Sequence, residues 1–176
     1  MNASFERLLV NEGLSLYIIT DPNLSMGRSH EDITRRAIAG GADVIQLRDK
    51  DASTKELFDT ATRLREVTSR KGSLFIVNDR LDIALAVNAD GVHLGQDDLP
   101  IEAARKLLGK GRILGVSTEN GEQARKATLG GADYVAIGPI YEARTTKANA
   151  GTPVGPKAIT DLRQHTNLPI IAIGGI

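Results

Sequence analysis

Short apolar runs rich in β-branched residues alternate along this chain with amphipathic stretches, and this alternation is the strongest constraint on its fold. The runs are continuously apolar, as expected for parallel strands that are buried on both faces. Strands that alternate with helices predict a parallel α/β fold. The predicted strands cover residues 16–20, 44–47, 74–77, 92–94, 113–116, 134–137 and 170–173.

The stretches between these runs carry signals for helix ends. Ser53 is followed three residues later by Glu56, which is a capping box, and Gly72 is placed to end that helix. A helix-to-strand junction also recurs, since residues 39–45 read AGGADVI and residues 129–135 read LGGADYV, with NADGV at 88–92 as a looser copy. Repeated αβ units whose strands are each followed by polar residues favour a barrel, in which the loops after the strands build the site.

The predicted fold is therefore an α/β (β/α)8 TIM barrel, formed as a single domain over residues 1–176. A closed barrel needs eight strands and usually about 250 residues, with about 200 near the lower limit. The sequence predicts seven strands, so we expect the last βα unit to be lacking and the domain to be C-terminally incomplete. Open strand edges favour pairing with other chains, so we expect that the chain could form a homo-oligomer.

Charge and composition exclude several classes of function. The chain has 22 basic and 22 acidic residues, which argues against general binding to nucleic acid or to an anionic membrane. It has no cysteine, so it has neither a thiol nucleophile nor a Cys-ligated zinc. The N-terminal segment lacks an apolar signal core, and no apolar run has membrane-spanning length. We expect a cytoplasmic protein whose partners are small molecules.

Long polar side chains stand at the end of the second predicted strand. Gln46, Arg48 and Lys50 are two residues apart, so a strand would point them the same way. Arg can bind phosphate oxygens with two parallel hydrogen bonds, and Lys adds a point charge. These residues could therefore converge on a phosphorylated ligand. The alternative is solvated surface charge.

Acidic residues follow the next two strands. Asp79 comes after the third strand and Asp98 after the fourth. Mg²⁺ prefers oxygen ligands and often bridges one or two carboxylates to substrate phosphates. The sequence therefore suggests a magnesium site beside a diphosphate, although either Asp could instead cap the following helix.

Later strands end in small polar residues and glycine. Ser117 and Thr118 follow the fifth strand, where either hydroxyl could cap a helix. The long loop after the sixth strand contains Thr145, Thr146 and Lys147, a composition that suits anion binding. Gly174 and Gly175 follow the seventh strand, where exposed backbone N–H groups can approach a phosphate.

The three histidines form no catalytic or His-rich metal pattern. His30 lies at a helix start and is expected to be exposed, and His165 is expected at a helix end. His93 lies within the fourth strand, where it is expected to pack or to support the site.

Taken in order, these residues resemble the thiamine-phosphate synthase family over nearly the whole chain. The matching motifs are LYIITD at 16–21, QLRDK at 46–50, FIVNDR at 75–80, DGVHLGQDD at 90–98, GVS at 115–117, GPIY at 138–141, TK at 146–147 and IGGI at 173–176. The resemblance implies a transferase of thiamine biosynthesis. This enzyme would join a hydroxymethylpyrimidine diphosphate to a thiazole phosphate with Mg²⁺ as cofactor.

The resemblance also implies a role for each matching residue. The metal ligands would be Asp79 and Asp98. The catalytic residues would be Arg48, Lys50 and Lys147. The diphosphate substrate would be held by Gln46, Arg48, Lys50, Asn78, Ser117 and Lys147. The thiazole phosphate would contact Thr145, Thr146 and Gly175, with Thr145 replacing the family's first threonine in a loop that is one residue longer here.

Three other functions compete with this one. A related thiazole tautomerase shares the barrel but generally lacks the full diphosphate and metal set, so Asp98, Ser117 and Lys147 favour the synthase. A sugar-phosphate epimerase would explain Gly174 and Gly175 but not the polar residues after the second strand. A shortened barrel could also bind a phosphate ligand without turnover.

Overall fold

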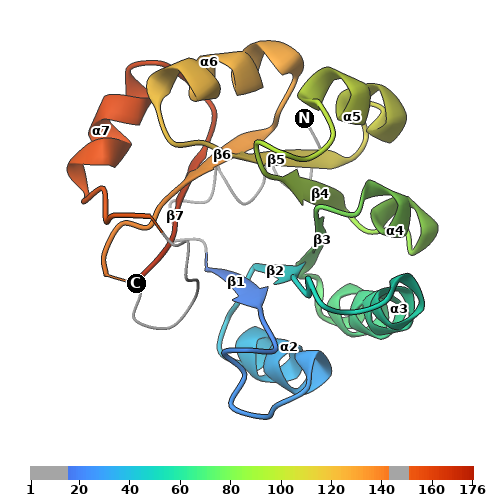
Figure 1. Ribbon diagram of the computed structural model, residues 1–176. Coiled ribbons are helices and arrows are strands. Elements are labelled where there is room, and N and C mark those ends of the chain that lie inside the picture. The colour runs from blue at the N-terminus through green and yellow to red at the C-terminus, as the bar shows by residue number, and fades with distance from the viewer. Residues whose placement is uncertain (1–15, 143–150) are drawn as a thin grey trace. The chain divides into compact units, whose positions relative to one another are not determined.

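The computed structural model describes residues 16–142 and 151–176 and contains parallel strands that alternate with helices (Figure 1). The strands are β1 (Tyr17–Thr20), β2 (Val44–Leu47), β3 (Leu74–Asn78), β4 (Gly91–Leu94), β5 (Ile113–Ser117), β6 (Tyr134–Ile137) and β7 (Ile170–Ala172). The helices are α2 (His30–Ala39), α3 (Thr54–Lys71), α4 (Leu81–Ala86), α5 (Ile101–Leu108), α6 (Gly121–Gly130) and α7 (Lys157–Arg163). Each predicted strand is present with ends within one residue of the prediction, which confirms the α/β class. The part of the chain that the structure describes contains no eighth strand.

The chain divides into two compact units, of which the first comprises residues up to Val92 together with 110–113. Its strands follow sequence order, with β1 parallel to β2 and β2 parallel to β3. Helices α2, α3 and α4 lie outside these strands (Figure 1). All four residues of β2 are buried, the polar Gln46 among them, as expected for a strand covered on both faces.

The second unit comprises residues 93–109 and 114–176. Here β5, β6 and β7 are parallel neighbours, again in sequence order. Helices α5, α6 and α7 follow one another along the outside of the strands (Figure 1). No helix within residues 16–142 and 151–176 combines the length and the apolar character that crossing a membrane would require.

The predicted helix signals are confirmed in the first unit. Ser53 accepts a hydrogen bond from the backbone N–H of Glu56, whose carboxylate in turn accepts from the Ser53 N–H. Helix α3 ends at Gly72, which has the left-handed φ of 77° that glycine adopts without a steric penalty. These local contacts set the boundaries of the long helix that precedes β3.

The aspartate of the repeated helix-to-strand junction anchors a neighbouring strand. Asp43 accepts a hydrogen bond from Leu16 N at 2.9 Å, Asp90 from Phe75 N at 2.8 Å, and Asp133 from Leu114 N at 2.8 Å. Asp90 also pairs with Arg65 of α3 at 2.5 Å, and Asp133 also pairs with Arg105 of α5 at 2.6 Å. The repeat therefore carries a structural role at the start of the strands, away from the polar residues that follow them.

Candidate active site

The polar residues at the end of β2 and in the loop after it each have a separate partner in the first unit. Gln46 is 2% exposed, and its Nε2 donates to the hydroxyl of Tyr17 at 2.7 Å. The β1–β2 register places Ile19 opposite Gln46 and Thr20 opposite Leu47, which brings the end of β1 beside the end of β2. Gln46 is thus held in a defined orientation by a side chain of the adjacent strand.

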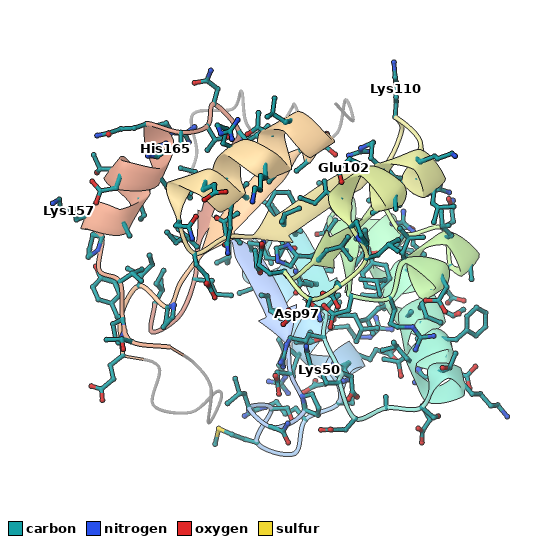
Figure 2. The ribbon with its side chains drawn as sticks, turned by 45° about the horizontal axis from the view of Figure 1, so that its top comes forward. Lys50, Asp97, Glu102, Lys110, Lys157 and His165 are labelled. Carbon is teal, nitrogen blue, oxygen red and sulfur yellow. The ribbon has the colours of Figure 1, made fainter. Side chains whose placement is uncertain are left out.

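Arg48 and Lys50 lie in the loop after β2, and both pair with an aspartate. The Arg48 guanidinium forms a partly buried ion pair with Asp21, which follows β1. Lys50 Nζ lies 3.2 Å from Asp79 Oδ2, and the Lys50 side chain remains 56% exposed (Figure 2). These pairs restrict both cations while leaving donor hydrogens for a ligand, because a guanidinium has five N–H donors and an ammonium has three.

Asp79 follows β3 in an uncommon backbone conformation. Its φ is +60°, in the left-handed region that costs a non-glycine residue roughly 1–2 kcal/mol. Asn78, the last residue of β3, accepts a short backbone hydrogen bond from Arg80 N at 2.6 Å. Arg80, and not Asp79, occupies the N-cap position of α4, so the alternative that Asp79 is the capping residue of this helix is wrong. The observed strain falls on a candidate ligand-binding residue, as is frequent at functional sites.

His30 lies at the same strand end, contrary to the prediction that it is exposed. Its Nδ1 is 2.8 Å from Thr20 Oγ1, and its Nε2 is 3.2 Å from Asp49 Oδ2. The side chain is only 12% exposed. The prediction failed because the turn from β1 folds the first residue of α2 back over the strand ends.

In the second unit, Asp98 lies in the turn after β4. Its Oδ2 accepts from Gly95 N at 2.6 Å, while Pro100 precedes α5 without a side-chain cap. The alternative that Asp98 caps the helix is therefore also wrong. The neighbouring Asp97 is exposed and projects from the same turn (Figure 2).

Ser117, the last residue of β5, contacts β4 through its side chain. Its Oγ lies 2.9 Å from His93 Nε2, and its carbonyl accepts from Gln96 Nε2 at 2.6 Å. Thr118 donates to the Ala136 carbonyl, and α6 is capped by Asn120. Neither predicted hydroxyl caps a helix, which leaves Ser117 at the strand end where a ligand contact was predicted.

His93 is buried, and burial lowers its pKa to about 4, with the charge of Asp98 opposing this shift. An imidazole in the unfolded chain titrates near pH 6.5. Between about pH 4 and pH 6.5 the unfolded chain therefore binds more protons at this position than the folded chain. We expect the unfolding free energy to fall as the pH falls through this window, with the full contribution present above it.

The check is urea unfolding at about pH 5 and about pH 7.5 for the parent chain and for His93→Gln. The change in unfolding free energy between the two pH values should be smaller in His93→Gln. Equal changes in both proteins would contradict the assignment of this pH dependence to His93.

Gly174 and Gly175 follow β7 and have φ values of +92° and +72°. A Cβ at Gly174 would lie 2.6 Å from Pro139 Cα, and one at Gly175 would lie 2.7 Å from the Tyr141 carbonyl carbon. Glycine is therefore required here by both the φ values and the close approach of the segment after β6. The predicted residues Thr145, Thr146 and Lys147 lie outside the described residues.

Several residues that orient the predicted set were not assigned a role from the sequence. Tyr17 and Asp21 lie within the motif LYIITD, yet the sequence does not say that they contact Gln46 and Arg48. Tyr134, which contacts His93, looks in the sequence like any apolar strand residue. Only the strand register could have identified these pairs.

A metal could be held by carboxylates acting together with a substrate. Within residues 16–142 and 151–176, no three or more His, Asp or Glu side chains group closely enough to hold a metal ion. Mg²⁺ in phosphate-transfer sites commonly takes one or two carboxylates, with water and substrate oxygens supplying the rest. Asp79 and Asp98 both offer carboxylate oxygens, and each carboxylate has about four lone pairs, enough for a protein contact and a metal together. The chemistry of these two donors therefore fits Mg²⁺.

Comparison with known proteins gives a consistent result. The family described as thiamine monophosphate synthase matches residues 16–176. A thiamine-phosphate synthase of Chloroflexus aurantiacus is 52% identical, covering 92% of this chain and 74% of that protein. One of Methanospirillum hungatei is 53% identical, covering 92% and 78%. The structure of a thiamine phosphate pyrophosphorylase from Pyrococcus furiosus is similar with a TM-score of 0.81 at 37% identity, covering 93% of this chain and 76% of that one.

Proposed function

The chain belongs to the thiamine monophosphate synthase family, and on that premise we propose that it joins 4-amino-2-methyl-5-hydroxymethylpyrimidine diphosphate to 4-methyl-5-(2-phosphoethyl)thiazole. The products are thiamine phosphate and diphosphate. The enzyme is thus a transferase of thiamine biosynthesis, and the tautomerase, epimerase and non-catalytic alternatives have no support. Its likeness to the Pyrococcus furiosus structure also supports the finer proposal that its strands belong to a (β/α)8 barrel.

The observation that carries the assignment of the diphosphate site is the paired cations after β2. Arg48 is held by Asp21, and Lys50 lies beside Asp79. Two positive groups anchored by carboxylates at one strand end suit a ligand that carries several negative charges. Gln46 and Asn78 would orient the same substrate, and Ser117 and Lys147 would complete its contacts.

The proposed reaction breaks the bond between the pyrimidine methylene carbon and the diphosphate oxygen. The electron pair of that bond leaves with the diphosphate, and the lone pair of the thiazole nitrogen forms the new C–N bond. This sequence needs no general base. The task of Arg48, Lys50 and Lys147 is to stabilise the negative charge that gathers on the leaving diphosphate.

Asp79 and Asp98 would hold Mg²⁺, which when bound supplies further positive charge to the diphosphate oxygens. The left-handed φ of Asp79 supports this role, because residues in sparsely populated backbone conformations are frequent at ligand-binding sites. The ion pair of Lys50 with Asp79 would then place a residue that binds the diphosphate next to a residue that binds the metal.

Thr145, Thr146 and Gly175 would bind the thiazole phosphate. The backbone of Gly175 is free of a Cβ and has a positive φ, so its N–H can approach a phosphate oxygen closely. Alignment of the thiazole nitrogen with the methylene carbon would then provide the remaining acceleration.

The decisive experiment is to incubate the chain with both substrates and Mg²⁺ and to measure thiamine phosphate by chromatography. Formation of thiamine phosphate and diphosphate in equal amounts is expected. A chain that folds and binds the pyrimidine diphosphate but forms no thiamine phosphate would contradict the proposed function.

Arg48→Lys is expected to lower kcat/KM for the pyrimidine diphosphate by roughly 10- to 100-fold, about 1–3 kcal/mol. Lysine keeps the charge but loses the two parallel hydrogen bonds of the guanidinium. Arg35→Lys is the matched control, because Arg35 pairs with Glu31 on an exposed helix surface. Normal kinetics for Arg48→Lys would show that Arg48 does not contact the substrate.

A further inference from the structure

The buried His93 of β4 contacts both Ser117 of β5 and Tyr134 of β6 in the second unit. His93 is 7% exposed; its Nδ1 lies 2.9 Å from the Tyr134 hydroxyl, and its Nε2 lies 2.9 Å from Ser117 Oγ. The two rings are stacked, with centroids 5.5 Å apart and 25° between their planes. Both ring nitrogens are thus within hydrogen-bond distance of a hydroxyl, and the ring has a fixed orientation.

Gly115 provides the space for this arrangement. A Cβ at Gly115 would lie 2.0 Å from Tyr134 Cζ, so any other residue there would displace the Tyr134 ring. The glycine on β5, the tyrosine on β6 and the histidine on β4 therefore depend on one another, and together they determine what Ser117 contacts.

The imidazole carries one proton at neutral pH, because burial disfavours its charged form. One ring nitrogen therefore donates and the other accepts. If Nδ1 carried the proton, Ser117 would have to donate its hydroxyl hydrogen to Nε2, and only its lone pairs would remain for a ligand. If Nε2 carries the proton, His93 donates to Ser117 Oγ, and the Ser117 hydrogen remains for a ligand.

The choice between these forms matters for an anion. Phosphate oxygens accept hydrogen bonds, so a serine that presents only lone pairs would repel them, whereas a serine that presents its hydrogen would bind them. Tyr134 favours the second form, since a phenol is an effective donor and can supply its proton to an unprotonated Nδ1.

We propose that His93 is a positioning residue, which Tyr134 holds in the tautomer with Nε2 protonated so that Ser117 donates its hydroxyl hydrogen to the diphosphate substrate. This inference rests on the proposed function, in which Ser117 contacts that substrate. It adds a chain of oriented donors that runs from Tyr134 through His93 to Ser117.

Two substitutions separate positioning from packing. In His93→Gln, the side-chain amide can reach the position of Nε2 and still donate to Ser117. In His93→Asn, the shorter amide reaches only the position of Nδ1, so the contact with Tyr134 is retained and that with Ser117 is lost. We expect His93→Asn to lower kcat/KM for the pyrimidine diphosphate roughly tenfold or more, as for a lost hydrogen bond to a charged group, and His93→Gln to remain within a few-fold of the parent.

Melting temperature and the KM for the thiazole phosphate serve as controls. A purely structural role predicts that activity follows melting temperature in both variants, and such a result would overturn the proposal. In a Ser117→Ala background, His93→Asn should cause little further loss, because the group that His93 positions is already absent. An equal loss with and without Ser117 would contradict the link between them.

Two further measurements do not depend on turnover. ¹⁵N NMR of the three histidines should show His93 neutral and protonated at Nε2, with its Nε2 signal shifted in Ser117→Ala. Protonation at Nδ1 would refute the proposal even in a fully active enzyme. Calorimetric binding of inorganic diphosphate with Mg²⁺ should weaken in His93→Asn but not in His93→Gln. If these results hold while no thiamine phosphate is made, the proposed function fails and the positioning role stands.

Discussion

Replacing Asp98 with Asn is expected to raise the Mg²⁺ concentration needed for half-maximal synthesis by roughly 100-fold or more. Loss of a neighbour that merely orients a metal ligand already costs about 10- to 100-fold in metal affinity, so loss of a charged ligand should cost at least the upper end of that range. Asn keeps the shape and can still accept from Gly95 N, so the fold should persist. The check is the rate of thiamine phosphate formation as a function of Mg²⁺ concentration.

Asp79→Asn should act in the same direction and also release Lys50 from its ion pair. Asp97→Asn and Asp82→Asn are the matched controls, because both carboxylates are exposed neighbours of the proposed ligands. Binding of Mn²⁺ in the presence of diphosphate, followed by electron paramagnetic resonance, gives a readout that is independent of turnover. Unchanged metal dependence in both ligand variants would remove Asp79 and Asp98 from the metal site.

Asp133→Ala should destabilise the chain by about 2–4 kcal/mol, because it removes one member of a largely buried pair. Asp133 Oδ2 accepts from Arg105 Nη2 at 2.6 Å and from Leu114 N at 2.8 Å. The side chains of Arg105 and Asp133 are 19% and 12% exposed, so water cannot fully replace the lost carboxylate. Urea unfolding gives the change in free energy.

The repeated junction supplies a control for this prediction. Asp43 stands at the same position of the repeat but accepts from Leu16 N at an exposed site, so Asp43→Ala should cost only about 1 kcal/mol. A comparable loss in both variants would mean that the arginine pair adds nothing. Asp133→Asn should fall between the parent and Asp133→Ala, because the amide oxygen can still accept from Leu114 N.

Much of the fold is predictable because it depends on local patterns. The largely apolar runs predict the seven strands within one residue, since burial on both faces of a parallel sheet favours apolar side chains at most positions of a strand. The capping box at Ser53 and the left-handed Gly72 set the ends of α3, because both act within a few residues. The polar residues at and after the strand ends, from Gln46 to Ser117, are recognisable for the same reason.

Tertiary structure alone decides which groups these residues contact. The parallel register of β1 and β2 brings Tyr17 to Gln46, and the strand ends bring Asp21 to Arg48; these pairs lie 29 and 27 residues apart in the sequence. His30 and His93 show the same limit, since an apparently exposed helix start and an apparently packed strand residue both hydrogen-bond to side chains of neighbouring strand ends. Sequence periodicity specifies which face a side chain occupies. Its partner, its burial and its protonation depend on residues that only the packing of strands and helices brings within a few ångströms.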